Sequence, residues 1–221
     1  MAILHGDKRP PPCTVTGNWV HVEGQQISHR KAITMPESKK IAFVIAPEGT
    51  ERVELTDPWD AVQDAGHQPV LISTQDGEAQ LFDHLDRADT VPVDSVVQDV
   101  SIDDFDALVL PGGVANPDAL RLQSDAVKFI GGFVESGKPV AAICHAPWTL
   151  VEADVVRGRQ LTSWPSLQTD IRNAGGDWVD ERVVVDGNLI TSRKPDDLPA
   201  FIAAVLEATN HGADSAEAAQ A

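Results

Sequence analysis

The fold of this chain is decided by the stretch VAAICHAP, residues 140–147. Its first four residues are apolar and small or branched, as in a strand that is buried on both faces. Cys144 comes directly after them, where helix-like sequence begins. So sharp a turn requires small residues two positions before and two positions after the nucleophile, and Ala142 and Ala146 meet that requirement. The stretch therefore predicts a nucleophile elbow that carries Cys144.

The sequence on both sides of this elbow alternates between short apolar runs and segments with helical spacing. Strands are expected at 41–46, 69–73, 107–110 and 140–143, and helices at 53–65, 124–135, 146–153, 167–173 and 198–208. Weaker patterns predict a hairpin within 76–99, a short strand near 161–162 and a hairpin over 183–191. This alternation predicts an α/β fold, in which helices cover both faces of a mostly parallel sheet. Ligands bind such sheets outside the carboxyl ends of the strands.

The composition is that of a globular protein with one domain. The chain has 221 residues, of which 42% are apolar and 23% charged. Residues 1–38 contain three consecutive prolines and show no sustained periodicity, so we expect an extension outside the core. The domain itself is expected over 39–210, followed by an acidic, alanine-rich tail at 211–221. Cys13 lies in the extension, and we expect no chemical role for it.

The charge of the chain excludes several classes of partner. Asp and Glu outnumber Lys and Arg by 34 to 17, which gives a formal net charge of −17. Such a field repels phosphate backbones and anionic lipids, so general nucleic-acid or membrane-surface binding is not expected. No stretch approaches the roughly 20 apolar residues of a spanning helix, and the N-terminus lacks the apolar segment of a signal peptide. With only two cysteines, the sequence favours a reducing compartment, the cytoplasm.

The elbow has a direct chemical consequence for Cys144. It holds the sulfur over the strand ends and directs a helix N-terminus at it, and both effects favour the thiolate. The alternative is that Cys144 is a buried small apolar residue, as free cysteines often are. Gly112 and Gly113 follow the neighbouring expected strand and favour the catalytic interpretation, since their backbone amides can serve as oxyanion donors.

Candidate partners for the cysteine are a histidine and three carboxylates. His145 follows Cys144 directly, and only the sharp turn of the elbow would bring it near the sulfur. Glu48, Glu51 and Glu54 follow the first expected strand, on the same rim as Cys144. One of them could share a proton with the thiol, or all three could be ordinary surface carboxylates. The histidines show no helical metal-ligand spacing, so we expect no metal site.

With these features the chain resembles the DJ-1/PfpI family, and most closely its bacterial and archaeal PfpI-like branch. The resemblance runs from about residue 40 to 208 and rests on six ordered motifs: ERVEL (51–55), FDALVLPGG (105–113), AICHAP (142–147), TSWPS (162–166), NAG (173–175) and VVVDGN (183–188). It implies a flavodoxin-like fold and a homo-oligomer, either a dimer or a hexamer. The extension before Met35 has no counterpart in the family core.

The resemblance also implies roles for individual residues. Glu54 matches the family glutamate whose carboxyl bonds the cysteine sulfur, which reverses the surface interpretation for this residue. His145 matches the histidine that PfpI-like members use with an acid from a neighbouring subunit, and Asp118 is the candidate for that acid. The chain departs from the family pattern in two places. At position 118 an aspartate replaces the family glutamate, after a loop from Val114 to Pro117 that is one residue longer, and Ala146 replaces a glycine.

Three functions are compatible with these residues. The first is a cofactor-independent deglycase or glyoxalase III activity on methylglyoxal or its protein adducts, with Cys144 as nucleophile, Glu54 as proton shuttle and both glycines as oxyanion donors. The second is an intracellular cysteine peptidase that uses Cys144, His145 and Asp118. The third is a non-enzymatic oxidation sensor or stress chaperone. We favour the first, because its small buried pocket suits a small substrate, whereas a peptidase needs an open groove.

Overall fold

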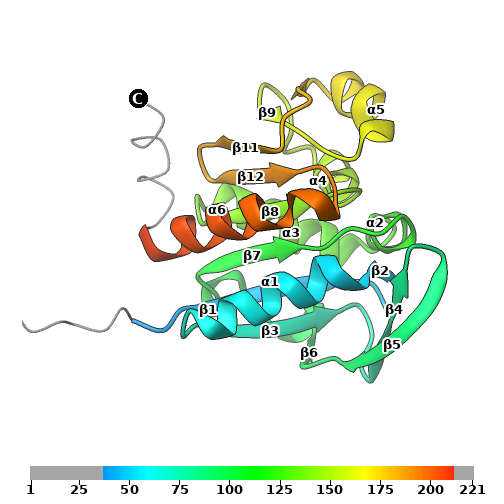
Figure 1. Ribbon diagram of the computed structural model, residues 1–221, viewed down its shortest axis with the longest axis vertical. Helices are drawn as coiled ribbons and strands as arrows, with labels where there is room; N and C mark the ends of the chain where they lie inside the picture. Colours follow the sequence, from blue (N-terminus) through cyan, green and yellow to red (C-terminus); the bar gives the residue numbers. More distant parts are fainter. Residues whose placement is uncertain (1–36, 212–221) are drawn as a thin grey trace, which may run out of the picture. The chain divides into compact units, whose positions relative to one another are not determined.

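The computed structural model describes residues 37–211, and within them the α/β prediction is confirmed. A seven-stranded sheet forms the centre of this part of the chain (Figure 1). In spatial order its strands are β11 (Val183–Asp186), β12 (Leu189–Ser192), β8 (Val140–Ile143), β7 (Ala107–Leu110), β1 (Lys40–Ile45), β3 (Gln68–Ser73) and β6 (Ser95–Val96). Only the β11–β12 pair is antiparallel within this sheet. Most of the expected extension with Cys13, and most of the expected tail, lie outside the described residues.

Helices cover both faces of this sheet. One face carries α1 (Arg52–Asp64) and α6 (Leu198–His211), which lie in front of the strands in Figure 1. On the other face lie α2 (Ala115–Leu120), α3 (Ser124–Glu135), α4 (Pro147–Glu152) and α5 (Gln168–Asn173). Four short 3-10 helices complete the helical elements: η1 (Val97–Asp99), η2 (Ile102–Asp104), η3 (Pro165–Leu167) and η4 (Pro195–Asp197).

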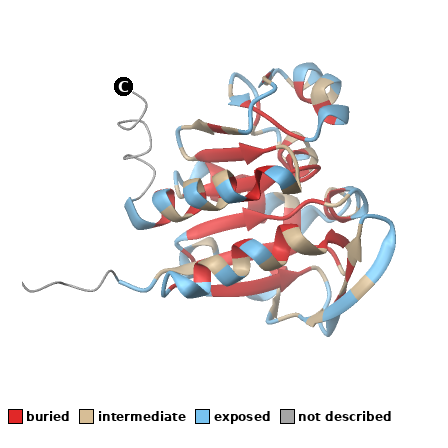
Figure 2. Cartoon of the chain, viewed as in Figure 1, coloured by how far each residue is buried: buried red, intermediate tan, exposed pale blue. Residues whose placement is uncertain are grey.

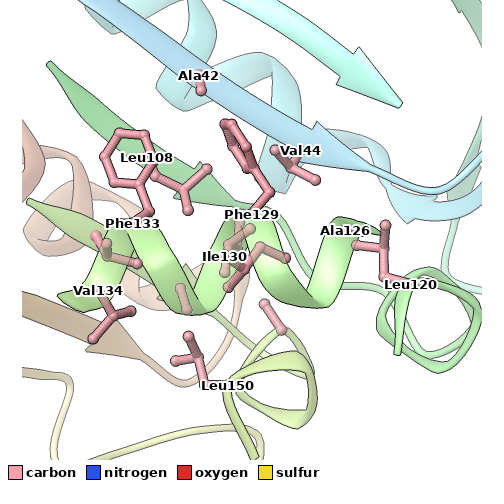
Figure 3. Packing of buried hydrophobic residues seen from close by; sticks show 14 of the residues in the cluster. Ala42, Val44, Leu108, Leu120, Ala126, Phe129, Ile130, Phe133, Val134 and Leu150 are labelled. Carbon is pink, nitrogen blue, oxygen red and sulfur yellow. The ribbon is translucent and has the colours of Figure 1, made fainter. Parts of the chain in front are cut away.

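The core consists of two apolar clusters, one on each face of the sheet. Every residue of β7 and β8 is buried, as Figure 2 shows for the central strands in general. In one cluster, Phe129, Ile130 and Phe133 of α3 pack against β1 and β7 (Figure 3). The other cluster joins α1 and α6 to the opposite side of the same strands. Burial on both faces explains why these strands are continuous apolar runs without alternation.

Two smaller sheets flank the central one. The hairpin expected within 76–99 is confirmed as β4 (Glu78–Asp83) and β5 (Asp86–Pro92), which pair antiparallel. A strand that the sequence did not predict, β2 (Glu48–Glu51), pairs with β4 and connects this hairpin to the start of α1. β9 (Gln160–Leu161) and β10 (Asp177–Trp178) form the second small sheet.

One local expectation is wrong. The segment from Val114 to Pro117 was expected as a loop, but the chain enters α2 at Ala115. Pro117 is compatible with this helix because it lies in the first turn, where a backbone N–H has no partner within the helix. Asp118 therefore occupies a fixed position on a short helix, immediately after the glycine pair of the candidate site.

Candidate active site

Cys144 lies at the carboxyl end of β8, in the strained conformation that a nucleophile elbow requires. Its φ is +63°, in the left-handed region that residues other than glycine seldom adopt. Two neighbouring segments hold the backbone there: the Cys144 N–H donates to the Ser192 carbonyl at 3.0 Å, and the Trp164 N–H donates to the Cys144 carbonyl at 2.8 Å. The side chain is only 6% exposed. Strain imposed by surrounding contacts is typical of a functional residue.

Glu54 approaches the sulfur from the first turns of α1 and is fully buried. Its Oε2 accepts the Gly112 N–H at 2.9 Å, and its carboxyl also hydrogen-bonds the Cys144 side chain. Its Oε1 has no hydrogen-bond partner among the described residues. Burial, assisted by the nearby charge of Glu51, raises the pKa of Glu54 to about 8. The carboxyl is therefore protonated at neutral pH and can donate a proton.

The expectation that the elbow favours a thiolate is not met by the isolated chain. Burial raises the pKa of the Cys144 thiol, and the charge of Glu54 raises it further. The backbone amides of Gly113 and His145 act in the opposite direction but are weaker. A protonated Glu54 carries no charge, so the effect of its charge on the thiol pKa is removed, whereas the effect of burial remains. The thiol still needs a base close to the sulfur.

His145 is the candidate for that base, because it lies within reach of the sulfur. Its Nδ1 lies 3.2 Å from Cys144 Sγ, because the elbow brings together two adjacent side chains that would diverge in a regular strand. The imidazole ring stacks on Trp164, with ring centroids 5.6 Å apart, and its Nε2 lies 3.4 Å from Ser166 Oγ. Burial lowers the pKa of His145, so the ring is neutral at pH 7 and able to accept a proton.

The two glycines of the expected oxyanion site have different roles in the geometry. The Gly112 N–H is bonded to Glu54, so in this arrangement it is not free to bind a reacting oxygen. Glycine is required there, because a Cβ would lie 2.5 Å from Glu54 Oε2 and 2.7 Å from the Cys144 Cβ. The Gly113 N–H lies close enough to both the Glu54 carboxyl and the Cys144 thiol to lower their pKa values, and the backbone N–H of His145 has the same effect on the thiol. The residue after an elbow nucleophile commonly supplies such a donor.

These groups open into a pocket of about 160 Å³. Glu54, Cys144 and His145 line it together. Two exposed apolar side chains, Leu85 and Val114, lie at its edge. Its remaining lining residues are Glu51, His84, Gly113, Trp164 and Pro195.

Sequence reasoning missed the contribution of the β4–β5 hairpin to this pocket. His84 lies at the hairpin tip, between β4 and β5. Its backbone N–H donates to Glu51 Oε2 at 3.0 Å, which fixes the tip beside the pocket. Arg52 adds a two-pronged ion pair to Asp83 at 2.8 Å. A polar turn gives no sign in the sequence of the element against which it packs.

The remaining acidic candidates lie outside the pocket. Asp118 is exposed on α2, and its proposed partner is His145 of a neighbouring subunit, so a single chain does not test it. Glu48 is exposed and pairs with Arg87 at 3.6 Å, which is the ordinary surface role considered for it. Among residues 37–211, no group of three or more His, Cys, Asp or Glu side chains is placed to hold a metal ion.

The geometry agrees with the family comparison. A model of the DJ-1/PfpI family matches residues 39–208. The chain belongs to this family. Among curated DJ-1/PfpI relatives, it is 46% identical over 165 residues to "Protein/nucleic acid deglycase 2" of Escherichia coli (strain K12), covering 74% of this chain and 94% of the relative. It is 42% identical over 164 residues to "Putative cysteine protease YraA" of Bacillus subtilis (strain 168), covering 74% and 94%.

A solved structure of the family supports the fold. The crystal structure of Drosophila melanogaster DJ-1beta matches with a TM-score of 0.71 and 31% sequence identity, covering 83% of this chain and 97% of that chain. The flavodoxin-like arrangement expected from the resemblance is thus confirmed. Across the part of the chain that the structure describes, no helix has both the length and the apolar character needed to cross a membrane.

Proposed function

We propose that this protein is a cofactor-independent deglycase or glyoxalase III-like enzyme that acts on methylglyoxal or its early protein adducts. The observation that carries this proposal is the placement of Cys144 between a protonated acid, Glu54, and a neutral base, His145, in one small pocket. Nucleophile, acid and base are the groups that addition to a carbonyl and subsequent proton transfer need.

The first step forms a hemithioacetal. The sulfur of Cys144 adds to the aldehyde carbon of methylglyoxal while His145 Nδ1 accepts the thiol proton. The carbonyl oxygen gains a proton from Glu54 and becomes a hydroxyl. As negative charge develops on that oxygen, the backbone N–H groups of Gly113 and His145 stabilise it. They take the place of the Gly112 N–H, which the sequence led us to expect as a donor.

The second step is an internal redox rearrangement. Glu54, now a carboxylate, removes the hydrogen of the hemithioacetal carbon as a proton and returns it to the neighbouring carbon, while the hydroxyl proton moves between the two oxygens. The product is a lactoyl thioester on Cys144. Water hydrolyses it to lactate, the thiol regains its proton from His145, and Glu54 takes one from water. The net reaction converts methylglyoxal and water to lactate and a proton, without an external oxidant or cofactor.

The size of the pocket supports this substrate class over a peptide. Typical ligand pockets measure about 300–1,000 Å³, whereas the pocket at Cys144 has about 160 Å³. The name of the E. coli relative, a protein and nucleic acid deglycase, supports the same class. In an early protein adduct, Cys144 displaces the amine or thiol of the protein from the former carbonyl carbon, and the thiol proton goes through His145 to that leaving group. The resulting hemithioacetal on Cys144 then gives lactate by the same second step.

The second candidate is a cysteine peptidase, favoured by the contact of 3.2 Å between Cys144 and His145 and by the protease name of the B. subtilis relative. In that case Asp118 of a neighbouring subunit would orient His145, and the active assembly would be a dimer or hexamer in the cytoplasm. A non-enzymatic oxidation sensor built on Cys144 and Glu54 is the third alternative.

The proposal is tested by lactate formation from methylglyoxal, with fluorescent casein cleavage measured on the same samples. We expect wild type and Cys13→Ala, which removes the other cysteine, to form lactate at equal rates. Cys144→Ala should form none, and Glu54→Gln should lose at least about a hundredfold in kcat. Casein cleavage without lactate formation would support the peptidase, and no activity in either assay would support the oxidation sensor.

A further inference from the structure

Asn116 is buried completely beneath the candidate active site, although Ala115 and Asp118 on the same helix are exposed. Its side chain makes three hydrogen bonds to the backbone. Oδ1 accepts the N–H of Ala46, at the end of β1, at 2.7 Å. Nδ2 donates to the Pro111 carbonyl at 2.8 Å and to the Gly112 carbonyl at 3.1 Å. Both donor hydrogens of the amide are thus in use, and both bind the turn after β7.

These two carbonyls belong to the peptide groups that face Cys144. In a planar trans peptide, the C=O of one residue and the N–H of the next point in opposite directions. When the Pro111 carbonyl points to Asn116, the Gly112 N–H points away from it, toward Glu54 Oε2 at 2.9 Å. When the Gly112 carbonyl points to Asn116, the Gly113 N–H points away from it, on the side of the Cys144 sulfur and the Glu54 carboxyl. One side chain therefore orients both amides.

The turn needs such a constraint, because it is built from two glycines. Glycine rotates about its backbone dihedrals with little steric restriction, and Gly113 has a φ of +83°. Side chains at these positions cannot supply the rigidity: a Cβ on Gly112 would collide with the Glu54 carboxyl, and one on Gly113 with the Gly49 carbonyl. The only other backbone bond to the Gly112 carbonyl in the described chain, from the Glu51 N–H, is longer, at 3.4 Å.

We propose that Asn116 is a positioning residue for the reaction: by holding the Pro111 and Gly112 carbonyls, it aims the Gly112 N–H at Glu54 and the Gly113 N–H at the sulfur and the developing oxyanion. The expected effect of Asn116 on lactate formation rests on the proposed function, whereas its expected effect on the pH dependence of Cys144 alkylation does not. Asn116 touches neither substrate nor sulfur, so it acts only through these two peptide groups.

The test uses full-length Asn116→Ala and Asn116→Ser, since serine retains one short donor. Leu120→Ala is the matched control, because Leu120 is buried in the same helix, α2, and forms none of these bonds. The first readout is the rate at which iodoacetamide alkylates Cys144 from pH 6 up to the highest pH at which the protein stays folded, followed on its tryptic peptide by mass spectrometry so that Cys13 does not contribute. The second is kcat and KM for lactate formation, and thermal unfolding reports the fold.

Loss of the oriented amides removes donors that favour the anionic forms of Cys144 and Glu54. We therefore expect the alkylation midpoint of Asn116→Ala to rise by about half a pH unit or more. We also expect kcat to fall at least about tenfold with KM changed less than about threefold, and Asn116→Ser to lie between Asn116→Ala and wild type. Leu120→Ala should unfold at lower temperature but keep the wild-type midpoint.

Two results would overturn the proposal: a wild-type alkylation midpoint in a folded Asn116 variant, or the same change of midpoint in Leu120→Ala. If Asn116→Ala does not fold, the midpoint of Asn116→Ser decides. If no protein forms lactate, wild type included, the proposed function fails, yet the alkylation midpoints still decide whether Asn116 orients the two amides.

Discussion

The two ends of the central sheet differ in a way that cavity size does not reveal. At the carboxyl end, the pocket around Cys144 measures about 160 Å³. At the opposite end, a larger cavity of about 450 Å³ lies between the start of β1, the turn before β8 and the end of α6. The larger cavity contains charged groups that already have partners: Lys39 pairs with Asp106, and Lys138 Nζ donates to two carbonyls. The smaller one contains a buried carboxyl with an unpaired oxygen.

Backbone strain separates the two ends as clearly as hydrogen bonding does. Near the site, Cys144 itself has a positive φ, and the side chains of Glu54 and Cys144 come so close to Gly112 that no Cβ fits. At the other end, Gly137 also has a positive φ, +78°, but a Cβ there would meet nothing within 4 Å. His67 Nε2, near the opposite end, is also buried without a partner among the described residues. Function is thus indicated by backbone strain and an unpaired buried polar atom that occur together in one pocket, and not by the larger cavity.

The comparison predicts opposite results for removing one carboxyl at each end. Glu54→Gln keeps the shape of the side chain but removes the proton shuttle, so kcat for lactate formation should fall by about 10²–10⁴. Asp106→Asn is the matched change at the other end, where Oδ2 accepts the Lys40 N–H and an amide oxygen can do the same. It should keep wild-type kcat. Equal activities of the two variants in the lactate assay would show that the buried carboxyl is not the shuttle.

A methyl group added at each end sharpens the contrast. Gly112→Ala places a Cβ against Glu54 Oε2 and the Cys144 Cβ, so the carboxyl must move and kcat should fall at least about a hundredfold. Gly137→Ala meets open space and costs only the left-handed conformation, about 1 kcal/mol of unfolding free energy. Steady-state kinetics and urea denaturation of both variants provide the check. A fully active Gly112→Ala would mean that Glu54 and Cys144 can move to admit the Cβ without loss of catalysis.

Most of the fold could be predicted from the sequence, because its strands are apolar runs bounded by glycine and proline. The helix expected at 124–135 has the same bounds in the structure, and β8 ends where the elbow was predicted. β2, with the sequence EGTE, was missed because it has no apolar pattern and is buried by its pairing with β4 and by contacts with α2. α2 was missed because Asn116 and Pro117 are typical of loops.

The site was less predictable, since its chemistry depends on contacts between distant residues. The elbow pattern alone indicated Cys144 as the candidate nucleophile. The sequence pattern did not distinguish Glu54 from Glu48 and Glu51, and only the family resemblance did so. Asn116 escaped notice because its acceptor bond reaches Ala46, 70 positions away. The pKa of Cys144 was expected to fall, since elbow geometry is visible in a sequence whereas the degree of burial is not.

The pH dependence of stability distinguishes a buried neutral Glu54 from an exposed one. Its pKa is about 8 in the folded chain, against an ordinary value of 4.5. Between these values the folded protein holds a proton that the unfolded chain has released, so the stability from this group is lost as the pH rises. From pH 4.5 to 8.5, the free energy of unfolding of wild type should fall by on the order of a few kcal/mol more than that of Glu54→Gln, which has no carboxyl at position 54.

Denaturant unfolding of both proteins at the two pH values measures this difference, and other titrating groups cancel because both chains share them. Parallel pH dependences would mean that Glu54 is solvated and ionised in the folded protein. That result would also weaken its role as the proton donor of the first step, because an ionised carboxyl has no proton to give.

The smallest effect is expected at the opposite end of the sheet, for Lys138→Met. Methionine keeps much of the apolar stem that lies beside Phe133, but it loses the bonds of 2.9 and 2.7 Å from Nζ to the carbonyls of Ile102 and Phe105. We expect about 1–2 kcal/mol lower unfolding free energy and unchanged lactate kinetics. A loss of activity that exceeds the loss of folded protein would mean that the larger cavity takes part in function, and the contrast between the two ends would then fail.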